Sequence, residues 1–298
     1  MKVLAGDIGG TTARLLLAAV ERGAVRPIFE ADSRSGDYPD LAPLVQAFLA
    51  DAGEAARGVA AACFAVAGPV AETPEGETAQ VTNLPWRLDS AALSEMLGLP
   101  RTRLINDFQA AAYGLEALAP TDLLTLQPGR PVPGAPRVLI GAGTGLGEAV
   151  LVWTGEHYRP LPSEGGHADL APGDTEEQAL LAHLRERFGH VSWERAVSGP
   201  GLVNVFEFLR AHRRREPSPA LAEALAAGDA AAAISESALA QRDGLAMAAL
   251  AMLVRLYGAQ AGNLALTVLA RGGVYIGGGI APKILEWLRH GPFLEAFR

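Results

Sequence analysis

The sequence LAGDIGGTTARLLL, residues 4 to 17, decides the fold. It contains an apolar run, an acid, two adjacent glycines, two threonines, an arginine and a second apolar run. Apolar runs that flank a glycine pair are typical of a β-hairpin with a tight turn. Such a turn can simply reverse the chain, or it can bind a ligand, because glycines let a ligand approach the backbone N–H groups. Taken alone, the stretch favours the plain turn.

The turn also carries polar side chains that a simple chain reversal does not need. Asp7 precedes the glycines, where its carboxylate could hold a Mg²⁺ ion directly or through water. The residues after the glycines carry groups that could reach phosphate oxygens: Thr11, Thr12 and Arg14. The chain has no G-x-x-x-x-G-K-[ST], and its second glycine-rich stretch, GAGTGLGEA, does not fit G-x-G-x-x-G. A P-loop and a Rossmann turn are therefore excluded, and the sequence indicates phosphate contact by a hairpin.

The hairpin pattern occurs a second time in the chain. Residues 137–140 are apolar after Arg137, residues 141–147 form a glycine turn, and residues 148–153 are a second run that is apolar after Glu148. The stretch GAGTGLGEAVLV thus matches GDIGGTTARLLL in the order of its elements, as a duplicated β-rich unit would. Two such hairpins facing each other would clamp a polyphosphate.

The remaining pattern is of mixed α/β type, and 298 residues favour two lobes. After the opening hairpin, a third strand is expected at 24–34 beyond a turn at 21–23. Further strands and helices are expected to alternate in the first part: strands at 59–67 and 103–105, helices at 41–52, 90–97 and 108–118. The second part is mostly helical, with helices expected at 175–188, 200–213, 220–233 and 245–270 and a last strand at 273–276. Residues 128–136 are the most loop-like connector.

Composition indicates a soluble, globular protein of the cytoplasm. The chain is 49% hydrophobic and 19% charged, and no window approaches the apolar stretch of a membrane span. Its net charge of −8 gives no basic footprint for nucleic acid, and the run HRRRE at 212–216 is expected to be a solvated helix end. The single cysteine, Cys63, excludes an internal disulfide and a multi-cysteine zinc site, and no signal peptide precedes the first strand.

An acid follows the short strand that ends near residue 105. Asn106 and Asp107 lie where open α/β sheets present ligand-binding groups, and a helix follows at once. Asp107 could be the N-cap of that helix. It could instead be a general base that accepts a proton from an attacking hydroxyl, as in phosphoryl transfer to an alcohol. The two tasks can also be divided between neighbouring residues.

The stretch PSEGGHADL, residues 162–170, places Glu164 and His167 around a glycine pair. A carboxylate and an imidazole on such a loop suit a polyhydroxylated ligand. The alternatives are a core histidine or, less favoured, a metal site with Asp169, since no cysteine or second histidine stands at ligand spacing. Glu194, in SWERAVSGPG, is by itself better explained as a surface helix acid.

In this order, the motifs resemble those of bacterial glucokinases of the non-zinc group, within the hexokinase, actin and heat-shock-chaperone ATPase superfamily. The matching segments cover nearly the whole chain: GDIGGTTARL, INDF, GAGTGLG, EGGH, ERAVSGPGLVN and GGVYIGGGIAPK. The resemblance implies a two-lobed, duplicated ribonuclease-H-like (actin-like ATPase) fold with a central cleft that closes on sugar. The expected lobes are 1–106, small, and 107–298, large. The implied activity is ATP-dependent phosphorylation of the 6-hydroxyl of glucose, the first step of glycolysis.

The resemblance also assigns roles to residues. Asp107 would be the general base on the 6-hydroxyl. The other sugar hydroxyls would be held by Asn83, Asn106, Glu164, His167 and Glu194. Asp7 would position Mg²⁺. The nucleotide would be contacted by glycines and threonines of three motifs: Gly6, Gly9, Gly10, Thr11 and Thr12; Gly143, Thr144 and Gly145; Gly278 and Gly279. Family chains usually continue past a segment like FLEAFR, and homodimers are common among them.

Two other functions compete with this interpretation. A sugar-sensing regulator on a kinase fold normally has a DNA-binding helix-turn-helix before the first phosphate motif, which here begins by Gly6. An actin-like ATPase would not need the EGGH loop. The sequence does not rank glucose against mannose, glucosamine or fructose, nor ATP against ADP or polyphosphate.

Overall fold

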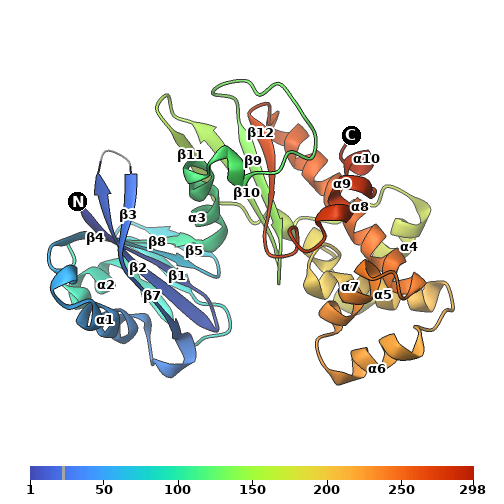
Figure 1. The fold of residues 1–298 in the computed structure, drawn as a ribbon, viewed down its shortest axis with the longest axis horizontal. Coiled ribbons are helices and arrows are strands. Elements are labelled where there is room, and N and C mark those ends of the chain that lie inside the picture. The colour runs from blue at the N-terminus through green and yellow to red at the C-terminus, as the bar shows by residue number, and fades with distance from the viewer. Residues whose placement is uncertain (22–23) are drawn as a thin grey trace. The chain divides into compact units, whose positions relative to one another are not determined.

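The computed structural model describes residues 1–21 and 24–298, which form two compact units, Met1–Gly114 and Leu115–Arg298 (Figure 1). The expected lobe boundary between residues 106 and 107 stays a prediction. The expected turn at 21–23 includes Arg22 and Gly23, which lie outside the described residues.

The first unit is built on a five-stranded sheet of order β3-β2-β1-β4-β8. Its strands are β1 Lys2–Ile8, β2 Thr12–Glu21, β3 Ala24–Arg34, β4 Val59–Val66 and β8 Thr102–Asn106. β1 is antiparallel to β2 and parallel to β4, which is parallel to β8. The opening hairpin and the strands expected after it are therefore confirmed. A smaller sheet, which the sequence analysis did not predict, contains β5 Val70–Thr73, β6 Gly76–Gln80 and β7 Arg87–Asp89.

Helices α1 Leu41–Ala52 and α2 Ser90–Leu97 cover this first sheet. β1 alternates between the core and solvent, so that Leu4 and Ile8 are fully buried with Leu41 of α1. Both helices begin at an aspartate cap, because Asp40 accepts from the Leu41 N–H and Asp89 from the Ala92 N–H. Ser90 is the first residue of α2, and its Oγ accepts from the Glu77 N–H at 2.8 Å.

The second unit contains a four-stranded sheet of order β11-β10-β9-β12. Its strands are β9 Arg137–Ala142, β10 Leu146–Trp153, β11 Tyr158–Leu161 and β12 Gly273–Gly277. β9 is antiparallel to β10 and parallel to β12, as β1 is to β2 and β4. Three turn residues separate the strands of each hairpin, 9–11 in the first and 143–145 in the second. The duplication predicted from the two glycine turns is therefore confirmed in strand order and direction.

The rest of the second unit is helical, as expected: α4 Thr175–Phe188, α5 Gly199–His212, α6 Pro219–Ala227, α7 Ala230–Leu239, α8 Gly244–Val268, α9 Leu285–His290 and α10 Phe293–Phe297. The helix expected at 220–233 is two helices, because α6 ends at Gly228 and Asp229 caps α7. Similarly, the helix expected at 108–118 is α3 Asp107–Gly114, followed by a 3₁₀ turn over Leu115–Ala117.

The long helix α8 is the core helix of the second unit. It is long and apolar enough to cross a membrane by length and composition, so the expectation that no window approaches a span is wrong. However, 67% of that apolar window is buried inside the unit. Two of its glycines let α10 pack closely against it. A Cβ on Gly258 would fall on the Phe293 carbonyl, and one on Gly262 would lie 2.6 Å from the Phe297 carbonyl oxygen. Packing against protein thus accounts for the apolar composition of α8.

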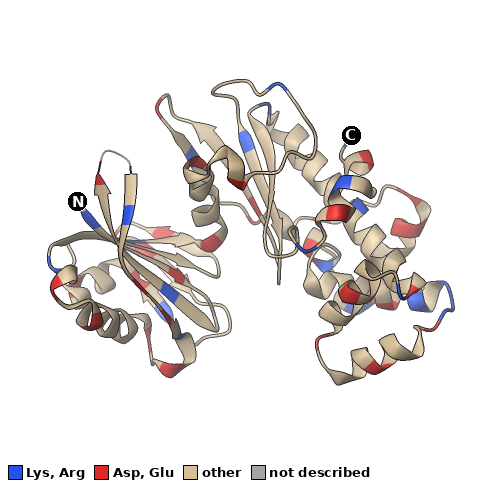
Figure 2. Ribbon diagram, in the orientation of Figure 1, with Lys and Arg blue, Asp and Glu red and all other residues tan. Residues whose placement is uncertain are grey.

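Charged residues are interspersed over the ribbon of both units (Figure 2). The basic run at the end of α5 is exposed, as expected, and arginines there form ion pairs with acids. Arg210 contacts Glu216 at 2.9 Å, and Arg213 contacts Glu176 at 2.8 Å. The run is therefore a charge-paired helix end.

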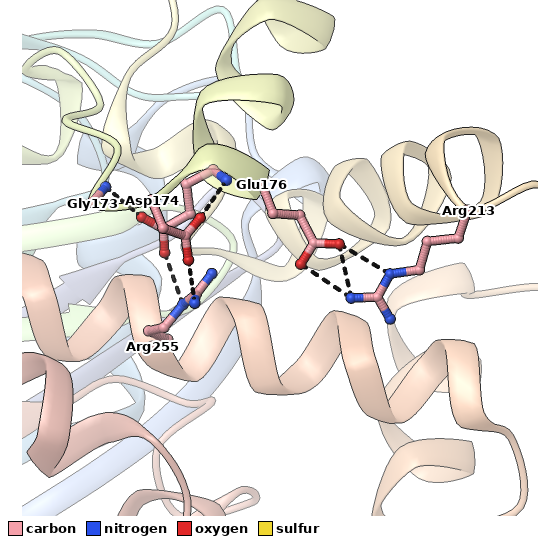
Figure 3. A network of polar contacts seen from close by, with 6 residues as sticks. Gly173, Asp174, Glu176, Arg213 and Arg255 are labelled. Atoms are coloured by element: carbon pink, nitrogen blue, oxygen red, sulfur yellow. Dashed lines mark hydrogen bonds and ion pairs between the residues drawn. The ribbon is translucent and has the colours of Figure 1, made fainter.

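A polar network holds the start of α4 (Figure 3). The Asp174 carboxylate accepts from the Glu177 N–H at 2.8 Å, and Glu177 accepts from the Gly173 N–H at 2.6 Å. Arg255 of α8 contacts both acids, Asp174 at 2.5 Å and the buried Glu177 at 2.9 Å. The Glu177 backbone hydrogen bond and, to a smaller extent, Arg255 hold the pKa of Asp174 below its ordinary value. The network fixes the segment that follows the EGGH loop to the core helix.

We expect Arg255→Met to lower the free energy of unfolding by about 2 kcal/mol at pH 7, because the buried Glu177 loses its cation. The matched variant is Arg213→Met, which removes the ion pair of Arg213 with Glu176, another acid of α4. It should lower the free energy of unfolding by less than about 1 kcal/mol. A depressed pKa means that the stability from Asp174 is present above its unfolded pKa, about 4, and is lost as pH falls through the folded pKa. Urea unfolding should therefore show the Arg255 effect shrinking below about pH 4. Equal costs for the two variants at pH 7 would contradict this assignment.

Candidate active site

The first unit gathers its candidate site residues at one edge of its sheet. The carboxyl ends of three parallel strands are in register there, since Ile8 pairs with Val66 and Val66 with Asn106. The first glycine turn therefore lies at the same edge as Asn106 and Asp107, although about 100 residues separate them in sequence. This is the edge at which open α/β sheets bind ligands.

Ser35 fixes the first glycine turn through two hydrogen bonds. The Gly9 N–H donates to the Thr12 carbonyl at 3.0 Å and closes the turn. Ser35 is fully buried; its Oγ donates to the Gly9 carbonyl at 2.7 Å and its N–H to the Thr11 carbonyl at 3.0 Å. The side chains of Thr11 and Thr12 stay exposed to solvent. Sequence reasoning missed Ser35, which lies in the polar stretch DSRSGDY without a recognisable motif.

Gly10 brings the Asn83 turn to this glycine turn. A Cβ on Gly10 would lie 2.5 Å from the Thr82 carbonyl oxygen and 3.3 Å from the Cβ of Asn83. Asn83 itself is exposed, with a left-handed backbone (φ 64°). A glycine is thus required at position 10 for packing alone, and it places a predicted sugar-binding amide beside a predicted phosphate-binding turn.

Asn106 and Asp107 divide two tasks at the start of α3. Asn106 is the cap, because its Oδ1 accepts from the Phe108 N–H at 2.9 Å and from the Gln109 N–H at 3.2 Å. Its amide also donates to the Gly68 carbonyl at 3.1 Å. The interpretation of Asp107 as the N-cap is therefore wrong: Asp107 is the first helical residue, exposed, with Oδ1 2.7 Å from the Phe108 nitrogen.

Gly6 and Asp7 lie within β1 and point to opposite faces of the sheet. Gly6 is buried, and a Cβ there would lie 2.6 Å from the Phe64 ring and 2.8 Å from Leu15, which gives Gly6 a packing role. Asp7 is exposed and opposite Arg14 in the hairpin register. Contact of either residue with a nucleotide or metal stays a prediction.

The second glycine turn has a helix beginning against it. The Gly143 N–H donates to the Gly145 carbonyl, and the Gly199 N–H donates to the Gly143 carbonyl, both at 2.8 Å. Gly199 is the first residue of α5, which has Ser198 as its N-cap. A helix N-terminus favours anions, because its N–H groups and dipole present positive charge. Phosphate binding at this turn, with Thr144 exposed on it, is electrostatically favoured.

Gly278 and Tyr257 fix the strand ends behind this turn. Gly278 has φ of 78°, and a Cβ there would lie 2.9 Å from the Ala142 nitrogen. The buried Tyr257 hydroxyl accepts from the Ala142 N–H at 3.1 Å and lies 3.2 Å from the Ile140 carbonyl oxygen. Burial raises the pKa of Tyr257, so its hydroxyl stays protonated. Gly279 follows with open space around it, as an adenosine-side contact would need.

The structure brings Glu164, His167 and Glu194 together beside the second turn. His167 Nε2 lies 3.8 Å from Glu164 Oε2, and its Nδ1 lies 3.9 Å from Glu194 Oε1. Glu194 Oε2 accepts from the Leu146 N–H at 3.0 Å, and a Cβ on Gly145 would lie 2.5 Å from it. One carboxylate thus contacts both the second glycine turn, where phosphate binding is predicted, and the predicted sugar loop.

These contacts overturn the plain structural interpretations of the three residues. The His167 side chain is 59% exposed, so it is not a core histidine. The Glu194 side chain is only 28% exposed and is directed at the turn, so it is not a surface helix acid. Asp169, the third candidate metal ligand, contacts His190 at 2.7 Å instead. Over residues 1–21 and 24–298, no group of three acidic, histidine or cysteine side chains could hold a metal.

Glu148, which the sequence analysis did not single out, is a buried acid that packs against Gly165 of the EGGH loop. It lies on β10, and a Cβ on Gly165 would fall on its carboxylate. Gln260 of α8 donates to Glu148 Oε1 at 2.8 Å. Burial raises the pKa of Glu148, and the Gln260 hydrogen bond partly offsets this. Gly166 lies just as close to the Leu146 carbonyl as Gly165 lies to Glu148. Both glycines of the loop are therefore required for packing.

We expect the free energy of unfolding of Glu148→Gln to rise relative to that of the wild type as the pH is raised from 5 to 8. A raised pKa means that the contribution of Glu148 is fully present below its unfolded pKa and is lost as pH rises through the folded pKa. Glutamine has no charge to bury and can still accept from Gln260. Urea unfolding at both pH values measures this, with the exposed Glu156→Gln as the control. A stability difference that does not change with pH would contradict the prediction.

Two repeats of one sheet, each with a glycine turn at the carboxyl ends of its parallel strands, define a kinase-type protein of the actin-like ATPase fold. A family model described as Glucokinase matches residues 4–298. The chain belongs to the glucokinase family.

Individual relatives agree with this assignment. The chain is 45% identical to a glucokinase of Nostoc sp., covering 99% of this chain and 89% of the relative. It is similar to the crystal structure of a glucokinase from an Antarctic psychrotroph, with a TM-score of 0.84, 30% identity and coverage of 99% and 88%. A ROK family glucokinase from Streptomyces griseus, solved with glucose and AMPPNP, has a TM-score of 0.63, 22% identity and coverage of 100% and 90%, which shows the fold alone. The protein is therefore an enzyme, and the regulator and ATPase interpretations are not supported.

Proposed function

We propose that the protein transfers the γ-phosphoryl group of ATP to the 6-hydroxyl of glucose. The observation that carries this proposal is the cluster of Glu164, His167 and Glu194 against the second glycine turn. Two carboxylates and an imidazole can each accept hydrogen bonds from sugar hydroxyls, while the adjacent turn and the α5 N-terminus favour phosphate. Family membership supports the same assignment.

Asp107 is the proposed general base. Its carboxylate accepts the proton of the 6-hydroxyl as the new bond from O6 to phosphorus forms and the bond from phosphorus to the bridging oxygen of ADP breaks. Asn106 supports this role by capping α3, which leaves Asp107 exposed. Asn83 and the second amide hydrogen of Asn106 are proposed to donate to other sugar hydroxyls.

The nucleotide is proposed to contact the residues of the two glycine turns and the segment after β12: Gly6, Gly9, Gly10, Thr11, Thr12, Gly143, Thr144, Gly145, Gly278 and Gly279. Asp7 fits a Mg²⁺ ion, because Mg²⁺ in phosphoryl-transfer sites is usually held by one or two carboxylates plus substrate phosphates and keeps several waters. An exposed carboxylate beside a phosphate turn meets that requirement without a ligand cluster. Bound there, Mg²⁺ would neutralise charge on the phosphate oxygens.

A coupled assay over a panel of sugars tests the proposal. Purified protein is incubated with glucose, mannose, glucosamine or fructose and with ATP, ADP or polyphosphate, and the phosphorylated sugar is detected directly. We expect the highest kcat/KM with glucose and ATP, and no turnover when Mg²⁺ is chelated. Absence of product with every pair would contradict the proposed function.

The proposal includes two further points that the resemblance implies. The enzyme is cytoplasmic, where Cys63 stays reduced, and it acts as a homodimer without nucleic acid or membrane partners. Sedimentation velocity at micromolar concentration tests the dimer, and a single monomer boundary would contradict it.

A further inference from the structure

The first glycine turn is closed differently from an ordinary β-hairpin. When two antiparallel residues form a hydrogen-bonded pair, each N–H donates to the carbonyl of the other residue. Gly9 and Thr12 close this turn, and the Gly9 N–H donates to the Thr12 carbonyl at 3.0 Å. Within residues 1–21 and 24–298, the Thr12 N–H does not return a bond to the Gly9 carbonyl. The Gly9 carbonyl is therefore left to another donor.

Ser35 is that donor. Its Oγ donates to the Gly9 carbonyl at 2.7 Å, and its N–H donates to the Thr11 carbonyl at 3.0 Å. Ser35 begins the 3₁₀ turn Ser35–Asp37 after β3, and its own carbonyl accepts from the Tyr38 N–H at 3.2 Å. The residue is fully buried, and a buried hydroxyl is costly unless it is hydrogen-bonded. The bond to Gly9 is therefore held in place by the surrounding chain.

The two bonds from Ser35 set the direction of two backbone N–H groups. The peptide bonds of the turn are trans, and the C=O and N–H of a planar trans peptide point in opposite directions. Since the carbonyls of Gly9 and Thr11 point toward Ser35, the N–H groups of Gly10 and Thr12 point away from it. Gly10 is half-buried and Thr12 is exposed. Backbone N–H groups that share a direction in a turn form an anion-binding nest.

We propose that Ser35 is a positioning residue for phosphoryl transfer, which holds the Gly9 carbonyl so that the N–H groups of Gly10 and Thr12 bind the β- and γ-phosphate oxygens of the nucleotide. This inference rests on the proposed function and adds to it a residue that acts on the phosphates only through the turn. Without the hydroxyl, the Thr12 N–H can donate to the Gly9 carbonyl and complete the ordinary closing pair. The turn then stays folded but loses a phosphate donor.

Calorimetric titration of the full chain with AMPPNP and with AMP, each with Mg²⁺, tests the proposal. AMP contains the adenosine but lacks the β- and γ-phosphates. We expect Ser35→Ala to raise the Kd of AMPPNP about tenfold and to leave the Kd of AMP within about twofold of the wild type. Ser35→Cys should behave like Ser35→Ala, because a thiol of similar size is only a weak donor. The matched control is Ser90→Ala, which removes another buried serine hydroxyl from the first unit and should leave both Kd values within about twofold.

Three outcomes would overturn the proposal. The first is an unchanged Kd of AMPPNP in both Ser35 variants. The second is an equal rise in the Kd values of AMPPNP and AMP, which would show that Ser35 only maintains the fold. The third is wild-type protein that binds AMPPNP no more tightly than AMP, because the turn would then hold no phosphate. These titrations contain no sugar, so a sugar panel without product would contradict the proposed function and leave the role of Ser35 in phosphate binding to be decided by them.

Discussion

Asp107→Asn should lower kcat for glucose phosphorylation by roughly 10² to 10⁴, while the KM for glucose changes less than about threefold. An amide cannot accept the hydroxyl proton, but it preserves the size of the side chain. Its oxygen can still lie near the Phe108 nitrogen, and the Asn106 cap of α3 is untouched. Steady-state kinetics with glucose and ATP, together with calorimetric titration of glucose, separate turnover from binding.

The matched control is Asp40→Asn, which changes the cap of α1 to another good capping residue. We expect its kcat to stay within about twofold of the wild type. Near wild-type turnover in Asp107→Asn would exclude Asp107 as the base. A large rise in glucose KM at unchanged kcat would instead assign Asp107 to sugar binding alone.

The two glycine turns were predictable from sequence because their signals are local. Alternating apolar residues and clustered glycines define a hairpin within about 14 residues, and repetition of the pattern predicts the duplication. The sequence analysis also placed Asn106 and Asp107 at a strand end, which follows from a short apolar run next to a helix start. It could not decide which residue is the cap, because both side chains can accept from N–H groups one or two residues away.

The supporting residues could not be predicted, because they act across long separations. Ser35 holds a turn 26 residues away, Gln260 holds Glu148 across 112 residues, and Tyr257 reaches Ala142 across 115. No local pattern distinguishes these side chains from other polar residues. The same applies to Glu194, whose surface interpretation was reasonable until the Leu146 N–H was placed 3.0 Å from it.

The packing glycines show why a motif can be recognised for two reasons. Each of three glycines lies so close to another backbone segment that a Cβ would not fit. Gly10 contacts the Asn83 turn, Gly278 the end of β9, and Gly166 the start of β10. Such glycines would be needed even without a ligand, so their presence in a motif does not by itself demonstrate phosphate contact. The exposed threonines and acids beside them carry the functional argument, and only substitution of those side chains tests it.

Glu194→Ala should lower kcat/KM for glucose by roughly 10² and should also raise the KM for ATP. A hydrogen bond to a charged group contributes about 1.5–3 kcal/mol, or roughly 10- to 100-fold in binding, which sets the loss for the sugar. The nucleotide effect has a separate cause. Alanine leaves the Leu146 N–H without its acceptor, so the second glycine turn loses the carboxylate that holds Leu146, the first residue of β10 after the turn.

Two variants separate these causes. Glu194→Gln keeps an acceptor for the Leu146 N–H but loses the charge, so it should impair glucose and leave the KM for ATP within about twofold. Glu164→Gln changes a carboxylate that contacts His167 and is 61% exposed, and it should likewise affect the sugar alone. An unchanged KM for ATP in Glu194→Ala would contradict the coupling of sugar loop and glycine turn through this carboxylate. A raised KM for ATP in all three variants would instead show that sugar binding itself controls nucleotide binding.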